Sequence, residues 1–244
     1  MLRDLSAMEN YAIGATDGVI GRVKDFYFDD EAWVVRYLVV ETGPWLAHRK
    51  VLISPLSLGV TGSERVFPAQ LTQQQVKNSP DIDTDKPVSR QHELDFIGYY
   101  GYPAYWGGAS LWGSELSPQL LARDGGVHTI PLPGQHDDPH LRSVNAVMSY
   151  RVQASDGSIG KLAGLLVDES TWAIRFLVVN TGHWWHGYEV LIAPEWIEDI
   201  NWADATVTVD LSRDSVRAAP NYEEQSMPWR ARAVRTDENQ AGTR

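Results

Sequence analysis

The sequence predicts a mainly β protein made of two small β-barrels, each followed by a short helix and joined by an aromatic-rich linker. One observation behind this prediction is a repeat: residues 15–55 align without a gap with residues 154–194, and 18 of the 41 aligned positions are identical. Another is that each copy contains short runs of β-branched and aromatic residues bounded by Gly, Pro and Asp. Several short strands within about 70 residues cannot bury both faces as one flat sheet, so each copy is expected to close into a barrel.

Each copy predicts β-strands at matching positions. The expected strands cover residues 20–28, 33–40 and 51–53 in the first copy, and residues 159–167, 172–179, 190–192 and 206–210 in the second. The dipeptides Asp17-Gly18 and Asp156-Gly157 indicate tight turns, because Gly accepts a positive φ. Gly21 and Gly160 interrupt a strand, which is typical of a bulge or a sharp bend.

A short helix is predicted to follow the strands of each copy. The segment Leu71–Lys77 matches Leu211–Arg217, and Thr72 and Ser212 stand where an N-cap residue is expected. Thr72 and Gln75 have the spacing of a capping box. Pro80 and Pro220 then end both helices at matching positions.

These boundaries divide the chain into four parts. We expect a first barrel domain at residues 1–80, a linker rich in aromatic residues, Gly, Pro and His at 81–146, a second barrel domain at 147–220 and a charged, flexible tail at 221–244. Within the linker, Ser89 is placed to cap a short helix that runs to Gly98.

Composition excludes several classes of function. The formal net charge is −11, from 21 basic and 32 acidic residues, which disfavours binding to nucleic acid or to an anionic membrane surface. The chain has no cysteine, so disulfides, thiolate nucleophiles and Cys-ligated metals are excluded. No apolar run reaches the roughly 18 residues that a spanning helix needs, and residues 1–14 lack the apolar core of a signal peptide. The expectation is an intact, cytoplasmic protein with no transmembrane segment.

The repeat carries a family pattern as well as strands. The first copy contains Asp17-Gly18-x-Ile20-Gly21, an Asp29-Asp30 turn, the run from Trp33 through Arg36 to Val40, Thr42-Gly43, and Val51-Leu52-Ile53-x-Pro55, each with a counterpart in the second copy. This pattern resembles the PRC-barrel domain, found in the cytoplasmic part of the photosynthetic reaction-centre H subunit and in the C-terminal half of the ribosome maturation factor RimM. The resemblance covers roughly 130–140 residues and is greatest to the two-barrel bacterial proteins of that family whose function is uncharacterised. It implies small β-barrels that dock onto proteins or lipid-associated assemblies, with no shared catalytic residues and no cofactor.

Two polar clusters suggest metal ligands. His136, Asp138 and His140 bring imidazoles and a carboxylate together, but Pro139 forbids the helix on which this His spacing would converge, so a solvated loop is the preferred interpretation. The Asp29-Asp30-Glu31 cluster is only partly kept in the second copy, so we interpret it as a hairpin turn that uses Asp.

Aromatic residues give the candidate protein-binding sites. In the linker, the stretch from Tyr99 to Trp112 supplies Tyr100, Tyr102, Tyr105, Trp106 and Trp112. These residues form either an external surface that binds another protein or an intramolecular clasp that packs on the barrels. The clasp is favoured because large exposed apolar patches are rare on monomeric proteins. His183, Trp185 and His186 have no counterpart in the first copy and are candidates for a role specific to the second copy. The matched pairs Trp33–Arg36 and Trp172–Arg175 predict a structural stack of guanidinium on indole.

The sequence therefore predicts a non-enzymatic adaptor or scaffold whose barrels bind another protein. The partner is unidentified, and a homo-oligomer is left open. The alternative is a metal- or small-ligand-binding sensor linked to stress. Calorimetry with Zn²⁺ and Ca²⁺ would reveal it through tight binding that is lost when His136 and His140 are changed. A hydrolase is a third class, disfavoured because no nucleophile, phosphate-binding loop or paired carboxylates stand out.

Overall fold

The computed structural model describes residues 1–60, 65–80, 90–106, 108–123, 141–182, 187–219 and 222, without the side chains of residues 90–92. The chain forms two compact units. Unit 1 comprises Met1–Met148 and Gly164–Leu177, and unit 2 comprises Ser149–Ala163 and Val178–Arg244. Unit 1 thus contains the first repeat, the linker and the middle of the second repeat.

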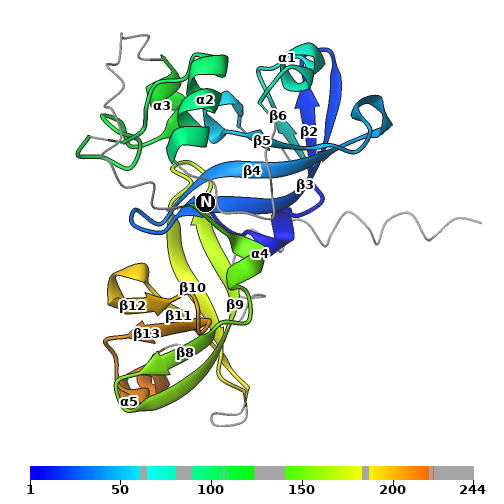
Figure 1. Ribbon diagram of the computed structural model, residues 1–244. Helices are drawn as coiled ribbons and strands as arrows, with labels where there is room; N and C mark the ends of the chain where they lie inside the picture. The colour runs from blue at the N-terminus through cyan, green and yellow to red at the C-terminus, as the bar shows by residue number, and fades with distance from the viewer. Residues whose placement is uncertain are drawn as a thin grey trace, which may run out of the picture. The chain divides into compact units, whose positions relative to one another are not determined.

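The described strands form two sheets, so the protein is mainly β (Figure 1). One sheet has the order β5-β4-β3-β2-β6, with β7 paired to β3, and its members are β2 (Ala12–Ala15), β3 (Gly18–Asp29), β4 (Val34–Thr42), β5 (Lys50–Ile53), β6 (Val66–Pro68) and β7 (Leu141–Ser143). The other has the order β11-β10-β9-β8-β13-β12, with β1 paired to β9, and its members are β1 (Leu2–Asp4), β8 (Arg151–Ala154), β9 (Gly157–Asp168), β10 (Ile174–Asn180), β11 (Glu189–Ile192), β12 (Ile197–Asn201) and β13 (Thr206–Val209).

The two sheets repeat one pattern of pairing. In the first, β2 pairs antiparallel to β3 and parallel to β6; in the second, β8 pairs antiparallel to β9 and parallel to β13. Each order has two free ends among the described strands, β5 and β6 in one sheet and β11 and β12 in the other. The described residues therefore show two sheets, and the closure of each into a barrel stays a prediction.

Helices are short and connect the strands. The α-helices are α1 (Gln73–Lys77), α2 (Arg90–Tyr100), α3 (Pro118–Arg123), α4 (Val144–Val147) and α5 (Arg213–Ala218). Short 3₁₀ helices are η1 (Ser6–Met8), η2 (Pro44–Leu46), η3 (Pro55–Ser57) and η5 (Pro194–Trp196).

The predicted helix caps are confirmed. The hydroxyl of Thr72 accepts from the Gln75 amide at 3.2 Å, and the Gln75 side chain accepts from the Thr72 amide at 2.8 Å, which completes the capping box of α1. Ser212 caps α5 by accepting from the Ser215 amide at 3.1 Å. Pro220, predicted to end this helix, lies outside the described residues.

The predicted bulges are also present beside the repeated glycines. Ile13 pairs with Gly21 while Gly14 pairs with Val19, so one residue of β3 has no partner on β2. Val152 pairs with Gly160 in the same way, and the register shifts at the next residue.

The linker contributes to the core of unit 1 by packing against the first sheet. Tyr27, Tyr37, Val39 and Leu52 of β3, β4 and β5 form one buried cluster with Phe96 of α2 and Leu141 of β7. The linker rings therefore complete a hydrophobic layer that the first repeat alone would expose to water.

The two repeats meet within unit 1 through a pair of equivalent hydrogen bonds. The Val35 amide donates to the Trp172 carbonyl at 2.8 Å, and the Ile174 amide donates to the Trp33 carbonyl at 2.7 Å. Val35 aligns with Ile174 and Trp33 aligns with Trp172, so each bond is the counterpart of the other under the repeat. Both tryptophans have a left-handed backbone, with φ of 54° at Trp33 and 59° at Trp172.

Candidate interaction site

The linker aromatics are enclosed to different degrees. Tyr105 and Trp112 are buried, with 4% and 0% of their surface exposed, whereas Tyr100, Tyr102 and Trp106 are half-buried. The rings of Tyr100 and Tyr102 stack at 5.1 Å between centroids. Burial raises the pKa of Tyr100 to about 12 and raises the pKa of Tyr102 further, so both hydroxyls stay protonated at neutral pH.

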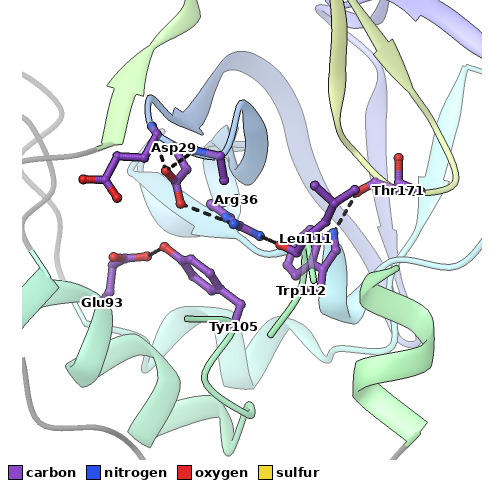
Figure 2. A network of polar contacts seen from close by, with 9 residues as sticks. Asp29, Arg36, Glu93, Tyr105, Leu111, Trp112 and Thr171 are labelled. Carbon is purple, nitrogen blue, oxygen red and sulfur yellow. Dashed lines mark hydrogen bonds and ion pairs between the residues drawn. The ribbon is translucent and has the colours of Figure 1, made fainter. Parts of the chain in front are cut away.

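Arg36 of β4 lies at the centre of the contacts between sheet and linker (Figure 2). Its guanidinium forms an ion pair with Asp29 at 3.2 Å and donates to the Leu111 carbonyl at 2.7 Å. The same group lies over the Tyr105 ring at 3.9 Å and over the Trp112 ring at 4.9 Å. The predicted stack of Arg36 on Trp33 is therefore wrong: linker rings that are distant in sequence take this place, and Trp33 stacks on Phe28.

Asp29 links this cation to the hairpin turn. One of its carboxylate oxygens accepts from the amides of Glu31 and Ala32 at 3.1 and 3.0 Å, as expected for a turn that uses Asp. The other oxygen faces Arg36. The next carboxylate, Asp30, forms an ion pair with Arg142 of β7 at 2.7 Å. The acidic cluster thus holds the turn and two arginines, which explains its composition without a metal.

A buried carboxylate lies beside the Arg36 contacts. Glu93 of α2 is fully buried and accepts a hydrogen bond from the Tyr105 hydroxyl (Figure 2). Burial and the nearby Glu93 carboxylate raise the pKa of Tyr37 well above its usual value. A carboxylate in this environment is stabilised by hydroxyl donors.

Trp112 joins the linker to the second repeat inside unit 1. Its indole N–H donates to the Thr171 carbonyl at 2.7 Å. Protein groups thus enclose both side chains: the indole donates to a backbone oxygen, and the Arg36 guanidinium donates to one backbone oxygen and to the Asp29 carboxylate. Such an arrangement fixes the linker on the sheet and leaves the central rings little surface for an external ligand.

Several predicted site residues lie outside the described residues. They are His136, Asp138 and His140 in the linker, and His183, Trp185 and His186 in the second repeat. Within the described part of the chain, no three His, Asp or Glu side chains are grouped so that they could hold a metal ion.

A different exposed site was missed by the sequence analysis. In unit 2, Tyr188 and Trp196 are 43% and 47% exposed, and Leu191 of β11 is half-buried. We call residues 188–201, which include β11, η5 and β12, the β11–β12 segment. Leu191 aligns with Leu52 and Trp196 with Ser57, and these counterparts are 1% and 6% exposed. The sequence signal was a Trp just after the matched segment, at a position where the first repeat has Ser.

The charge around this segment is one-sided. From Phe176 to Ser212 the sequence contains no Lys or Arg and six acidic residues. Glu195, Glu198 and Asp199 are all exposed. The segment therefore combines accessible apolar surface with a negative charge.

Comparisons with known proteins agree with the pattern in the first repeat. Residues 10–64 match the PRC-barrel domain. The matched residues include β2, β3, β4 and β5 of the first sheet. The chain is also 30% identical over 80 residues to an uncharacterised protein of Deinococcus radiodurans, a match that covers 33% of this chain and 29% of that protein. The aligned region thus spans less than a third of the relative. No described helix has the length and apolar character needed to cross a membrane.

Proposed function

We propose that the protein is a non-enzymatic adaptor that binds a partner protein through the β11–β12 segment. In this proposal both repeats are PRC-like barrels, and the second has the docking role. The observation that carries it is the exposure of Trp196, an aromatic of the kind that dominates protein–protein interfaces.

The contrast between the repeats supports the choice of segment. In unit 1, α3 packs against η3, and Phe96 packs in the cluster that contains Leu52. The corresponding positions of unit 2 are Trp196 and Leu191, and both retain exposed surface. A partner that covers Trp196 and Leu191 would bury the apolar surface of the second repeat, as the linker buries the corresponding surface of the first.

The charge of the β11–β12 segment defines the chemistry of the partner. The nearby acidic residues favour a segment that contains Lys or Arg together with an apolar or aromatic anchor.

The test replaces Trp196 by the residue that the first repeat has at this position. In the full chain, Trp196→Ser should leave the urea midpoint nearly unchanged and remove specific partner proteins from quantitative affinity capture. The matched control is Val60→Ser, which changes an 87% exposed residue in the first repeat. Identical captured proteins for Trp196→Ser and the unmodified chain would refute the proposal.

A further inference from the structure

We propose that the chain carries its own ligand for the β11–β12 segment: residues 223–236, which would compete with an external partner. This inference rests on the proposed function, because it concerns the same site. Residues 223–236 lie outside the described residues, whereas Tyr222, which directly precedes them, is described.

The chain reaches the start of β11 immediately before this segment. The Tyr222 amide donates to the Glu189 carbonyl at 2.7 Å, and Tyr222 is 9% exposed. Glu189 is the first residue of β11. The peptide that follows Tyr222 is therefore tethered at one end of the site that it would occupy.

The first repeat provides the precedent. After α1 the chain passes Arg49, whose guanidinium donates to the carbonyls of Lys77 and Ser79 at 3.1 and 2.7 Å. It then forms α2, which places Phe96 in the cluster with Leu52 of β5. In the first repeat, the segment after the closing helix thus packs on β5, the third predicted strand. In the second repeat, the segment after the closing helix α5 is the C-terminal one.

The C-terminal segment is long enough to bring Trp229 from Tyr222 to Trp196. Seven residues separate Tyr222 from Trp229, and an extended chain of seven residues spans about 23–25 Å. Seven residues also separate Glu189 from Trp196. Because Pro194–Trp196 forms the 3₁₀ helix η5, with a rise of about 2 Å per residue, the path from Glu189 to Trp196 is shorter than an extended peptide of seven residues, so Trp229 can reach Trp196.

The C-terminal segment complements the β11–β12 segment in charge and in apolar character. The proposed ligand begins with Glu223 and Glu224, and its remaining residues, 225–236, read QSMPWRARAVRT and contain three Arg and no acidic residue. The part of the second repeat that they would approach has no Lys or Arg and exposes Glu195, Glu198 and Asp199. Met227 and Trp229 supply the apolar anchors beside the basic residues.

Tethering makes even a weak interaction sufficient. A short flexible connection gives an effective concentration on the order of 1 mM. A peptide whose Kd is about 0.1 mM would then be bound about ten times as often as it is free. An external partner would have to overcome this roughly ten-fold reduction in apparent affinity.

Hydrogen–deuterium exchange of the full chain tests the inference. Exchange of amides within residues 189–201 should be several-fold faster in Trp229→Ala than in the unmodified chain, with β3 and β4 unchanged. A synthetic peptide of residues 223–236, added to the Trp229→Ala chain, should restore the slower exchange. The control is a chain that ends at Thr236, which keeps the basic segment and should exchange like the full chain.

Two outcomes would overturn the inference. One is equal exchange of residues 189–201 in Trp229→Ala and the unmodified chain. The other is a difference that appears only at high protein concentration together with dimers in sedimentation, because the ligand would then come from a second copy. Partner capture separates the two proposals. If Trp196→Ser loses captured partners, the adaptor function stands. If Trp229→Ala in the same experiments neither changes hydrogen exchange nor increases partner capture, the internal ligand fails.

Discussion

Two glycines occupy positions where a neighbouring strand leaves no room for a side chain. A Cβ atom on Gly21 would lie 2.1 Å from the Glu41 carbonyl oxygen, and one on Gly160 would lie 2.0 Å from the Asn180 carbonyl oxygen. The sequence predicted a bulge at both glycines, and the register confirms it. The close approach of β4 and β10 has no local signal, because it depends on strands about twenty residues away.

Substitution of either glycine should therefore disturb the backbone. Gly21→Ala and Gly160→Ala should each lower the free energy of unfolding by about 1–3 kcal/mol, because a carbonyl cannot move aside as a flexible side chain can. Gly98→Ala is the control: Gly98 is exposed in α2 with nothing within 4 Å of the added Cβ, so stability should rise by about 0.5–1 kcal/mol. Urea unfolding measures all three changes, and equal costs at the three sites would contradict the argument.

Asp25 should make stability depend on pH in a defined direction. Burial raises its pKa, although hydrogen bonds from Ser143 and the Asn145 amide oppose the shift. In the folded state the Asp25 carboxyl therefore keeps its proton at a pH where the unfolded chain has lost it. The contribution of Asp25 to the free energy of unfolding thus falls as the pH rises from the usual pKa to the raised pKa. Asp25→Asn should gain stability relative to the unmodified chain as pH increases from about 3.5 to 7.

Asp168 supplies the opposite case for the same measurement. Burial disfavours its ionised form, but hydrogen bonds from Ser170, together with the positive charges of the Met1 ammonium and Arg175, outweigh burial and lower its pKa. Its stabilising contribution is present above the usual pKa and is lost as pH falls through the lowered one. Asp168→Asn should lose stability relative to the unmodified chain as pH increases, and slopes of the same sign for both variants would rule out this assignment.

At the scale of elements, the linker is the part whose contacts were hardest to predict from the sequence. The aromatic stretch was predicted, as was a helix near residues 89–98, which is α2. The contacts of Arg36 with Tyr105 and Trp112 were not predicted. Both rings are far from Arg36 in the sequence, so the residues around Arg36 carry no pattern that indicates them. The burial of Tyr105 and Trp112 supports the clasp interpretation over an external surface.

Truncation of Trp112 should therefore cost stability. Trp112→Ala removes a fully buried indole, its hydrogen bond to Thr171 and its contact with Arg36, so the free energy of unfolding should fall by about 3–5 kcal/mol. Leu116→Ala, a 62% exposed neighbour, should change it by less than about 0.5 kcal/mol. The half-buried Trp106 should give an intermediate loss on change to Ala. An unchanged urea midpoint with an unchanged slope for Trp112→Ala would eliminate the clasp.

Short strands show the limit of sequence reasoning at this scale. The long repeated strands β3 and β9 carry clear patterns, and both were predicted. The three-residue strands β1 and β7 were not, since Leu2–Asp4 and Leu141–Ser143 become strands only by pairing with β9 and β3. Strand β12 was hidden in the same way by its acidic residues, which are depleted in strands.

At the scale of the whole molecule, the repeat was the most informative signal and also an incomplete one. It predicted matching strands, turns and caps, because these depend on residues within one copy. It did not show that Gly164–Leu177 of the second copy belongs to unit 1, because the bonds that place it there join the two copies. The exposed Trp196 was found by burial, although the mismatch with Ser57 could have revealed it.

The reciprocal bonds between Trp33 and Ile174 and between Trp172 and Val35 have the geometry of an isologous contact, in which each side offers the same surface. Nothing in these bonds distinguishes a neighbour on the same chain from one on another chain. Shortening residues 124–140 until the second copy cannot reach the first should therefore yield a domain-swapped dimer that retains both bonds, visible as a doubled mass in light scattering. Duplication within one chain would thus have turned a concentration-dependent association into a permanent one.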